Sequence, residues 1–378
     1  MNIRREIGLS GCVLLLSCGS DPSPGAGPDA GSPRGAPNGA PNGAPNGVVD
    51  PPLGAGVGTL AGAAESGDAD GPRGASRFNN PANVAVGPDG RIYVADYDNG
   101  LLRAIRADGQ TSTFTRQANF SRPFGLAFTP DGTLYAQTDA NDMGGRSYTT
   151  GTIWRIARDG AATVVARDLG RPRGLIALGD GRLVMADPEH HTLRILDPRD
   201  GRAAALAGAT DQAGYADGAG THARFNRPYD LALAGERILV ADQNNHRVRA
   251  VTLQGAVSTL AGDGTMGSVD GPAPRARFNR PQALARDGLG NVYVTEMDGY
   301  VVRRIAPDGT VTTVAGAGRA GFQDGEPMRA RFFGLEGIDV TPDGAYLYIA
   351  DGNRGGHDAN HRVRRLATGI VPGGAPGE

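Results

Sequence analysis

The sequence predicts an all-β protein: a six-bladed β-propeller of four-stranded antiparallel blades, in which an N-terminal strand completes the last blade. A unit of short, alternating apolar segments occurs six times along the chain. The last unit stops before the outer segment that ends four earlier units, such as VSTLAG at residues 257–262. A segment of this kind, VGTLAG at residues 57–62, stands before the first unit instead. A repeat array whose last unit is completed by its first strand closes into a ring.

Each unit contributes strands in a constant order. An inner strand follows a Pro-containing loop and is expected at residues 83–86, 125–128, 174–177, 230–233, 283–285 and 337–340. A second strand follows at residues 91–96, 133–138, 182–187, 237–242, 291–296 and 346–351. It ends in an acid in every unit but the second, which has Thr138 there. An Arg-rich third strand and an outer strand follow. The period-two alternation and the Asp-Gly turns between segments are typical of antiparallel sheets.

The N-terminal residues read as an export signal. Arg4 and Arg5 precede a short apolar run at residues 7–16, and Leu-Ser-Cys ends at Cys18. This order resembles the bacterial lipobox and predicts a signal peptide (1–17) with lipid attachment at Cys18. An ordinary secretory signal with a chance cysteine is the alternative. Residues 18–56 are rich in Gly and Pro and predict a disordered tether, followed by the propeller (57–369) and a disordered tail (370–378). The expected location is the cell envelope, on the outer membrane, held by the lipid anchor alone.

Composition narrows the partners. The net charge is −2 and no basic stripe is present, so nucleic acid is not an expected partner. The two cysteines, Cys12 and Cys18, both lie in the first 18 residues. The propeller therefore has neither a disulfide framework nor a cysteine-ligated metal.

Several short motifs recur in one order: ARFN-x-P, VAD-x-x-NHR, STLAG and G-x-x-DG. Residues 223–262 hold the best copy of the first three, while the second and third units lack the FN and the NHR. This pattern resembles NHL repeats over about residues 57–369, and the resemblance implies six blades.

The repeated polar residues are expected to be architectural. The aspartates of the G-x-x-DG motif are Asp70, Asp217, Asp270 and Asp324. They suggest a calcium site, but each lies in a different blade. This favours a structural role in hydrogen-bonded turns between blades. The arginines of the ARFN motif are Arg77, Arg224, Arg277 and Arg331. They are expected to pair with the acids that end the second strands. The histidines are spread around the ring, so a zinc site is not expected.

A candidate site lies where the chain enters the inner strands. Antiparallel blades place those loops, and the loops between second and third strands, on one face, which we call the loop-rich face. Six polar side chains are expected to meet there at the channel mouth: Asn83, Arg173, Tyr229, Asp230, Gln282 and Glu336. Resemblance to gluconolactonase-like hydrolases implies a divalent metal near this place, for which Asp230 and Glu336 are the candidate ligands. A water-filled channel mouth is the alternative, and no other cofactor is expected.

The sequence favours a binding module over an enzyme. No nucleophile motif such as Gly-x-Ser-x-Gly is present, so no catalytic residue is predicted. The expected ligand of the loop-rich face is a protein, a peptide or a glycan, held by aromatic anchors chosen from Tyr148, Tyr215, Tyr229, Tyr300 and Phe322. A metal-dependent lactonase, another hydrolase or a lyase with its site at the channel mouth is one alternative, and a structural spacer is the other.

Overall fold

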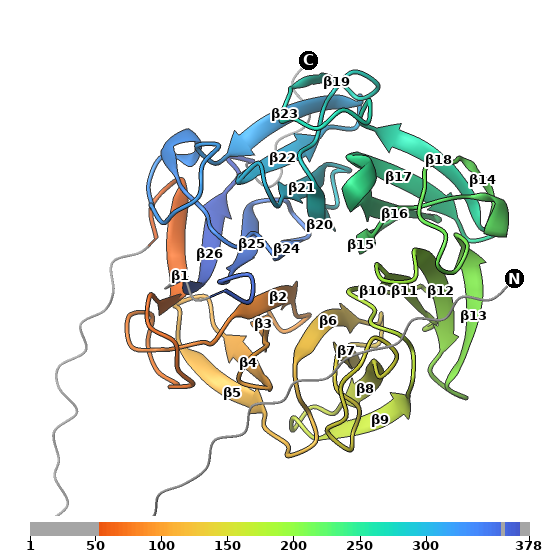
Figure 1. Ribbon diagram of the computed structural model, residues 1–378. Helices are drawn as coiled ribbons and strands as arrows, with labels where there is room; N and C mark the ends of the chain where they lie inside the picture. The colour runs from red at the N-terminus through yellow and green to blue at the C-terminus, as the bar shows by residue number, and fades with distance from the viewer. Residues whose placement is uncertain (1–52, 357–359, 371–378) are drawn as a thin grey trace, which may run out of the picture. The chain divides into compact units, whose positions relative to one another are not determined.

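The computed structural model describes residues 53–356 and 360–370, and it confirms the predicted fold class. Six antiparallel sheets surround a central axis as the blades of a propeller (Figure 1). The predicted signal peptide, Cys18 and nearly all of the predicted tether lie outside the described residues, as does the tail from residue 371. Within the described ranges, no helix is long and apolar enough to span a bilayer.

The blades follow one another along the chain. Blade 1 contains β2 (Pro81–Val86), β3 (Ile92–Asp96), β4 (Leu101–Ile105) and β5 (Thr111–Thr115). Blade 2 contains β6 (Pro123–Phe128), β7 (Leu134–Thr138), β8 (Thr152–Ile156) and β9 (Ala162–Ala166). Blade 3 contains β10 (Gly174–Ala177), β11 (Leu183–Asp187), β12 (Thr192–Asp197) and β13 (Arg202–Ala207). Blade 4 contains β15 (Pro228–Ala234), β16 (Arg237–Asp242), β17 (Arg247–Thr252) and β18 (Ala256–Ala261).

Blade 5 contains β20 (Pro281–Arg286), β21 (Val292–Glu296), β22 (Val301–Ile305) and β23 (Thr310–Ala315). Blade 6 contains β24 (Gly337–Val340), β25 (Tyr346–Asp351) and β26 (His361–Ala367). Short outer strands, β14 (Gly218–Ala219) and β19 (Gly271–Pro272), extend blades 4 and 5. Among the described residues, three short 3-10 turns are also present: η1 (Gly220–His222), η2 (Gln243–Asn245) and η3 (Pro327–Arg329).

The ring closes as predicted. Strand β1 (Val57–Ala63) pairs antiparallel with β26 and so becomes the outer strand of blade 6. Leu60 and Ala61 are fully buried, with Phe78, Val84 and Val363 in the same apolar cluster. The glycine that ends the motif has a conformational role. Gly62 has φ +87°, and a Cβ there would lie 2.2 Å from the carbonyl oxygen of His361. Only glycine fits this close approach without strain.

A buried arginine in the third strand organises four of the blades. In blade 1, Arg103 lies 3.0 Å from Asp96 and 2.6 Å from Asp70, and its guanidinium stands 5.0 Å from the ring of Phe78. It also donates to the carbonyl oxygens of Arg77 and Ala69. The equivalent arginines of blades 4, 5 and 6 make the same kinds of contact: Arg249, Arg303 and Arg364.

This arrangement corrects the predicted pairing. The strand-end acids do not bind the ARFN arginines, because Asp242, for example, lies 2.7 Å from Arg249 rather than binding Arg224. Arg224 contributes its carbonyl oxygen to the same arginine instead. The G-x-x-DG aspartates are held by an arginine and a threonine, as Asp270 is by Arg303 and Thr313, at 2.7 and 2.9 Å. In blade 6 the threonine comes from β1, where the hydroxyl of Thr59 donates to Asp324, at 2.9 Å.

Blades 2 and 3 depart from this arrangement. In blade 2, Trp154 occupies the place of the arginine and donates from Nε1 to Thr138, at 2.7 Å, while Phe120 packs against its ring. A neutral pair thus replaces the ion pair. In blade 3, Arg194 lies 3.7 Å from Asp187, which is also hydrogen-bonded to His190.

Three histidines connect successive blades. Nδ1 of His361 accepts a hydrogen bond from the backbone N–H of Asn80, at 3.0 Å, and so joins blade 6 to blade 1. His191 and His246 accept from the backbone N–H groups of Arg227 and Arg280, each at 3.2 Å. Nδ1 accepts only in the neutral imidazole, with the proton on Nε2. Burial lowers the pKa of all three imidazoles, and nearby arginines lower it further.

These contacts predict a pH dependence of stability. A folded-state pKa below the unfolded value means that the unfolded chain binds protons more readily, so the contribution is present above pH 6.5 and is lost as the pH falls below it. We expect His246→Asn, which does not titrate, to lose less free energy of unfolding than the wild type between pH 7.5 and 5, by about 1 kcal/mol or less. Denaturant unfolding at both pH values measures the difference.

The buried acids titrate in the wild type and in His246→Asn alike. The difference between the two proteins in pH dependence of stability therefore comes from His246. His222→Asn is the matched control, because His222 is exposed in the η1 turn. Equal pH dependence in His246→Asn and the wild type would exclude the neutral-imidazole contact as a source of stability.

Candidate functional site

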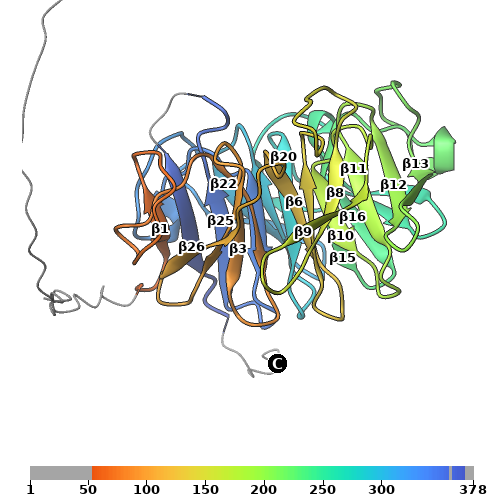
Figure 2. The ribbon, with the colours of Figure 1, turned by 90° about the horizontal axis from the view of Figure 1, so that it is seen from below.

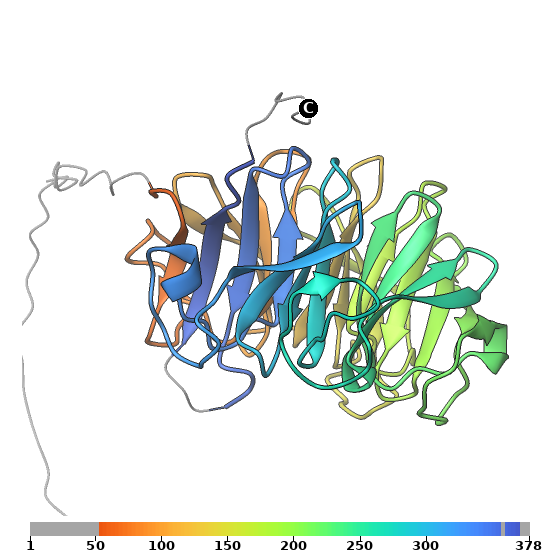
Figure 3. The same ribbon diagram turned by 90° about the horizontal axis from the view of Figure 1, so that it is seen from above.

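The two faces of the ring differ as expected. The loops into the inner strands share one face with the loops between second and third strands, and short turns form the other face, which we call the turn face (Figures 2 and 3). The candidate site residues lie where the inner strands begin, at the loop-rich end of the channel.

The residue after each inner-strand proline, or after Leu335 in blade 6, forms a layer around the axis. This entrance layer consists of Ala82, Phe124, Arg173, Tyr229, Gln282 and Glu336. All of these residues are buried except Tyr229, which is half-buried. The rings of Phe124 and Tyr229 meet edge to face with centroids 5.9 Å apart, and the guanidinium of Arg173 lies 4.2 Å from the Phe124 centroid. The layer therefore covers this end of the channel, where the sequence suggested an open polar mouth.

Arg173 is paired with a carboxylate. Its two terminal nitrogens donate to the two carboxylate oxygens of Asp139, at 2.9 and 3.0 Å. Asp139 also accepts from Arg171, at 2.9 Å, and from the hydroxyl of Tyr97, at 2.5 Å. Burial opposes ionisation of Asp139, but the two arginines outweigh it and hold its pKa below the usual value. Arg173 thus positions the layer and does not offer an unpaired cation to a ligand.

Gln282 is also engaged within the protein. Its Oε1 accepts from Nε2 of Gln243, at 2.5 Å, and Oε1 of Gln243 accepts from Arg280, at 3.2 Å. Arg280 in turn pairs with Asp298, at 3.2 Å. The network links the layer to the surface loops of blades 4 and 5.

Glu336 is the least satisfied member of the layer. It is 8% exposed, and its Oε1 has no hydrogen-bond partner within the described structure. Burial raises the pKa of Glu336 to about 8, although Arg173 and Arg354 act in the opposite direction. Burial likewise raises the pKa of Tyr229 to about 12. Both groups are therefore mainly protonated at neutral pH.

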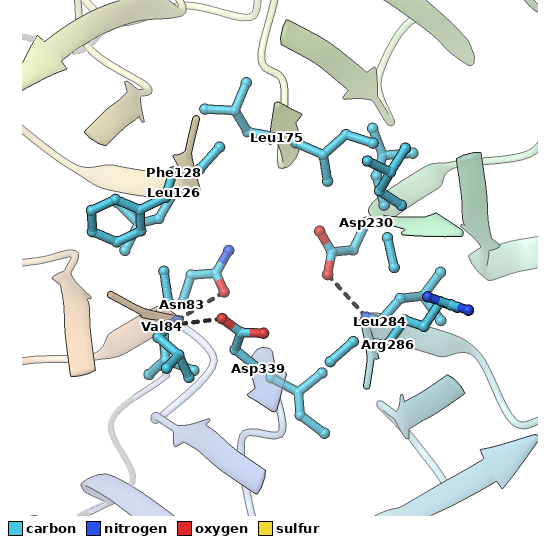
Figure 4. Close-up of a pocket in the computed structure, with 18 of the residues that line it drawn as sticks. Asn83, Val84, Leu126, Phe128, Leu175, Asp230, Leu284, Arg286 and Asp339 are labelled. Atoms are coloured by element: carbon cyan, nitrogen blue, oxygen red, sulfur yellow. Dashed lines mark hydrogen bonds between the residues drawn. The ribbon is translucent and has the colours of Figure 1, made fainter. Parts of the chain in front are cut away.

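A cavity of about 310 Å³ lies along the axis below the entrance layer (Figure 4). The inner strands are sheet edges, so their inward N–H groups have no partner in a ladder. Two carboxylates each satisfy one of these groups on the next blade. Asp230 accepts from Leu284 N, at 3.0 Å, and Asp339 accepts from Val86 N, at 2.7 Å, and from its neighbour Val340 N, at 2.8 Å.

The two carboxylates share the cavity with one amide. Asn83 accepts from Val84 N through Oδ1, at 2.8 Å, and Figure 4 shows its amide nitrogen pointing into the cavity. Burial raises the pKa of Asp230 to about 7, and the charge of Asp339 raises it as well. Burial raises the pKa of Asp339 to about 6. Both carboxylates therefore titrate close to neutral pH.

The metal-ligand candidates belong to different places. Asp230 lines the cavity with Asp339, whereas Glu336 lies in the entrance layer under the influence of two arginines. Among the residues that the structure describes, no three His, Cys, Asp or Glu side chains converge. The side chains present therefore do not fit a divalent ion bound by both Asp230 and Glu336.

The sequence reasoning missed Asp339 and Asp139. A signal for Asp339 was available, because it stands in the inner strand where the other five blades have Ala or Ile. Asp139 follows Thr138, the one second strand that does not end in an acid, so the carboxylate is displaced by a single residue. That displacement places it beside Arg173 instead of beside a third-strand arginine.

The fold and the entrance layer define a six-bladed propeller with a polar channel. Comparisons with known proteins support this class of fold. The family model for the NHL repeat matches residues 78–105, the inner three strands of blade 1 with the residues before them. NHL repeat-containing protein 2 of Bos taurus is 27% identical over 329 residues, which cover 81% of this chain and 41% of that protein. The chain spans less than half the length of the curated relatives it matches first.

Solved structures of similar fold include several bacterial proteins. A Bacteroides thetaiotaomicron protein of unknown function has a TM-score of 0.66 at 21% identity, covering 82% of this chain and 75% of that one. An auxiliary nutrient binding protein of Bacteroides ovatus has a TM-score of 0.63 at 20% identity, with 82% and 76% covered. The repeat match and the relatives support an NHL-repeat six-bladed β-propeller, and these solved structures share its fold.

Proposed function

We propose that the protein is an exported binding module that holds a protein or peptide partner on its loop-rich face. One observation carries the proposal. Of the large apolar side chains that are exposed in the described chain, only Leu289 and Tyr346 lie at the turn face. The other seven lie in the long connections, either between the second and third strands of blade 2 or between one blade and the next: Met143, Tyr148, Tyr215, Met266, Val269, Phe322 and Met328. Exposed apolar side chains concentrated in the long connections, away from the short turns, are typical of a protein-binding surface.

The exposed side chains differ in how firmly they are held. Tyr215 and Phe322 stack on Arg247 and Arg362, with the guanidinium carbons 3.9 and 3.8 Å from the ring centroids. Met143, Tyr148 and Met266 are between 62 and 85% exposed. Methionine adapts its shape to a partner and tyrosine supplies a rigid amphipathic anchor. Tyr229 and Tyr300, also considered as anchors, are half-buried and contribute less surface.

Site-specific photo-crosslinking in the native host tests this role. We expect photoreactive residues at positions 148 and 266 to capture one partner of the same mass, and the Tyr148→Ser, Met266→Ser double variant to lose its binding. Position 289 is the matched control, because Leu289 is 58% exposed on the opposite face. The same adduct from position 289, or none from the loop-rich face, contradicts the proposal.

The binding role rests on the surface described above and not on the neighbours' ligands. The nutrient binding protein of Bacteroides ovatus shares the fold at 20% identity, which carries no ligand over to this chain. A lactonase, hydrolase or lyase remains without a specific observation in its favour, since Asp230 and Glu336 lie apart. The crosslinking experiment also distinguishes a glycan ligand from a protein ligand, because the two give adducts of different chemistry.

Export and anchoring are proposed from the sequence of residues 1–18. We expect full-length protein expressed in a bacterial host to incorporate a labelled fatty acid and to sediment with the outer membrane. Cys18→Ala is expected to lose the label and to appear in the soluble fraction, whereas Cys12→Ala retains both properties. Labelling that persists in Cys18→Ala rules out Cys18 as the attachment site.

A further inference from the structure

We propose that the axial cavity binds a compact polyhydroxylated primary amine, which enters from the turn face. The cavity is separate from the loop-rich surface, so this inference does not depend on the proposed partner. It rests on where the cavity opens, on its charge and on an unused hydrogen-bond donor.

The exposure of the lining shows where the cavity opens. Five of the six residues of the entrance layer are buried, as described above. At the other end of the inner strands, Val86, Phe128, Ala177 and Leu233 are half-buried, and Arg286 is exposed. Solvent contact therefore increases toward the turn face, where only short turns border the channel. A small molecule reaches the cavity from that side.

The charge of the lining favours a cation. Asp230 and Asp339 line the cavity, and no described arginine or lysine forms an ion pair with either of them. Arg286 is the only cationic lining residue, and its side chain is at the exposed rim. Each ionised carboxylate offers about four lone-pair directions, of which the backbone N–H groups occupy some. A bound ammonium group would donate to the remaining ones and supply the missing positive charge.

The amide of Asn83 extends the recognition beyond charge. Asn83 is 8% exposed, and its Nδ2 donates no hydrogen bond within the described structure. Since it points into the cavity, it offers a donor to a ligand hydroxyl (Figure 4). An unused donor argues against a bare metal ion, which takes only acceptors. The apolar walls, such as Leu126, Leu175 and Leu284, accommodate a short carbon chain.

The size of the cavity agrees with a small ligand. About 310 Å³ is at the lower end of the range of roughly 300–1,000 Å³ for small-molecule sites. An amino sugar or amino alditol fits the combination of one ammonium, several hydroxyls and a short chain. A polypeptide does not fit a channel of this volume.

Calorimetric titration with glucamine, and with sorbitol as its neutral partner of equal size, tests the proposal on the folded protein. We expect glucamine to bind and sorbitol not to bind, since the two differ only in the ammonium group. Glucamine binding should weaken as the pH falls from 7.5 to 5.5, because Asp230 and Asp339 become protonated. Equal heats from both compounds overturn the proposal.

Two kinds of variant localise the binding. Asp230→Asn and Asp339→Asn keep a side-chain oxygen for the backbone N–H groups and remove the charge, and each should weaken glucamine by roughly tenfold or more. Ala177→Leu narrows the cavity without touching either carboxylate and should weaken it as well. Asp343→Asn, in an exposed turn on the same face, is the control and should bind as the wild type does.

Two outcomes overturn the site. Unchanged affinity in folded Asp230→Asn and Ala177→Leu places glucamine elsewhere. If magnesium or calcium chloride alone binds and glucamine does not, the cavity is an inorganic cation site. Because the loop-rich face carries none of these residues, failure here leaves the crosslinking result unaffected.

Discussion

Replacing Arg249 with methionine is expected to lower the free energy of unfolding by about 3–5 kcal/mol, because Asp242 would remain buried without its cation. Both side chains of this pair are fully buried. Arg249 also donates to the carbonyl oxygens of Arg224 and Ala216, which lose these bonds in the variant. Denaturant unfolding measures the change.

The protein supplies its own control for this experiment. Blade 2 places Trp154 and Thr138 where blade 4 has Arg249 and Asp242. The double variant Asp242→Thr, Arg249→Trp therefore copies a neutral arrangement that the fold already accommodates. We expect it to be more stable than Arg249→Met. A double variant as unstable as the single one would show that desolvated charge is not the source of the loss. Arg202→Met, in an ion pair whose arginine side chain is 89% exposed, should change stability little.

Removing the closing strand is expected to abolish cooperative unfolding. A chain that begins at Glu65 lacks β1, so β26 becomes a sheet edge and Phe78 and Val363 lose the packing of Leu60. Asp324 also loses the hydroxyl of Thr59. The loss combines a cavity between blades 6 and 1 with an unpaired strand. Thermal unfolding followed by circular dichroism should show a broad transition or none.

The reference for this truncation is a chain that begins at Leu53, so that the two proteins differ only in residues 53–64. Leu60→Ala provides a milder version, which should cost about 2–5 kcal/mol because Leu60 is fully buried. Leu289→Ala, at an exposed position, is its control. A cooperative transition at an unchanged temperature in the chain from Glu65 would mean that β1 does not hold the ring together.

The repeats made the fold predictable and the site only partly so. Local signals in each unit, the period-two alternation and the turns, are repeated six times, so an error in one blade is corrected by the others. The closing strand was predictable for the same reason, because its motif differs from residues 257–262 at only one position. The partner of Asp242 was not predictable in this way, because several arginines lie near it in sequence. In the folded blade it is Arg249 that is buried between Asp242 and Phe225.

The site depends on differences between the blades, which repetition does not reveal. Asn83 and Asp230 were expected beside Glu336, and the one-residue step between them along the inner strand places them in the cavity instead. A strand advances by about 3.3 Å per residue, enough to separate two layers around a narrow axis. Asp339 lies two residues below the level of Asp230, and only the three-dimensional ring brings the two carboxylates into one space.

The six blades are not held by the same buried contacts, and the two that differ are neighbours. Blades 4, 5, 6 and 1 each contain the buried arginine with its acids and phenylalanine, and they form one continuous arc that passes through the closure. Blades 2 and 3, with Trp154 and Arg194 in that position, make up the remaining arc. The two ends of the propeller are therefore joined among blades that share one set of buried contacts. The variation between blades lies elsewhere in the ring, in residues 123–207.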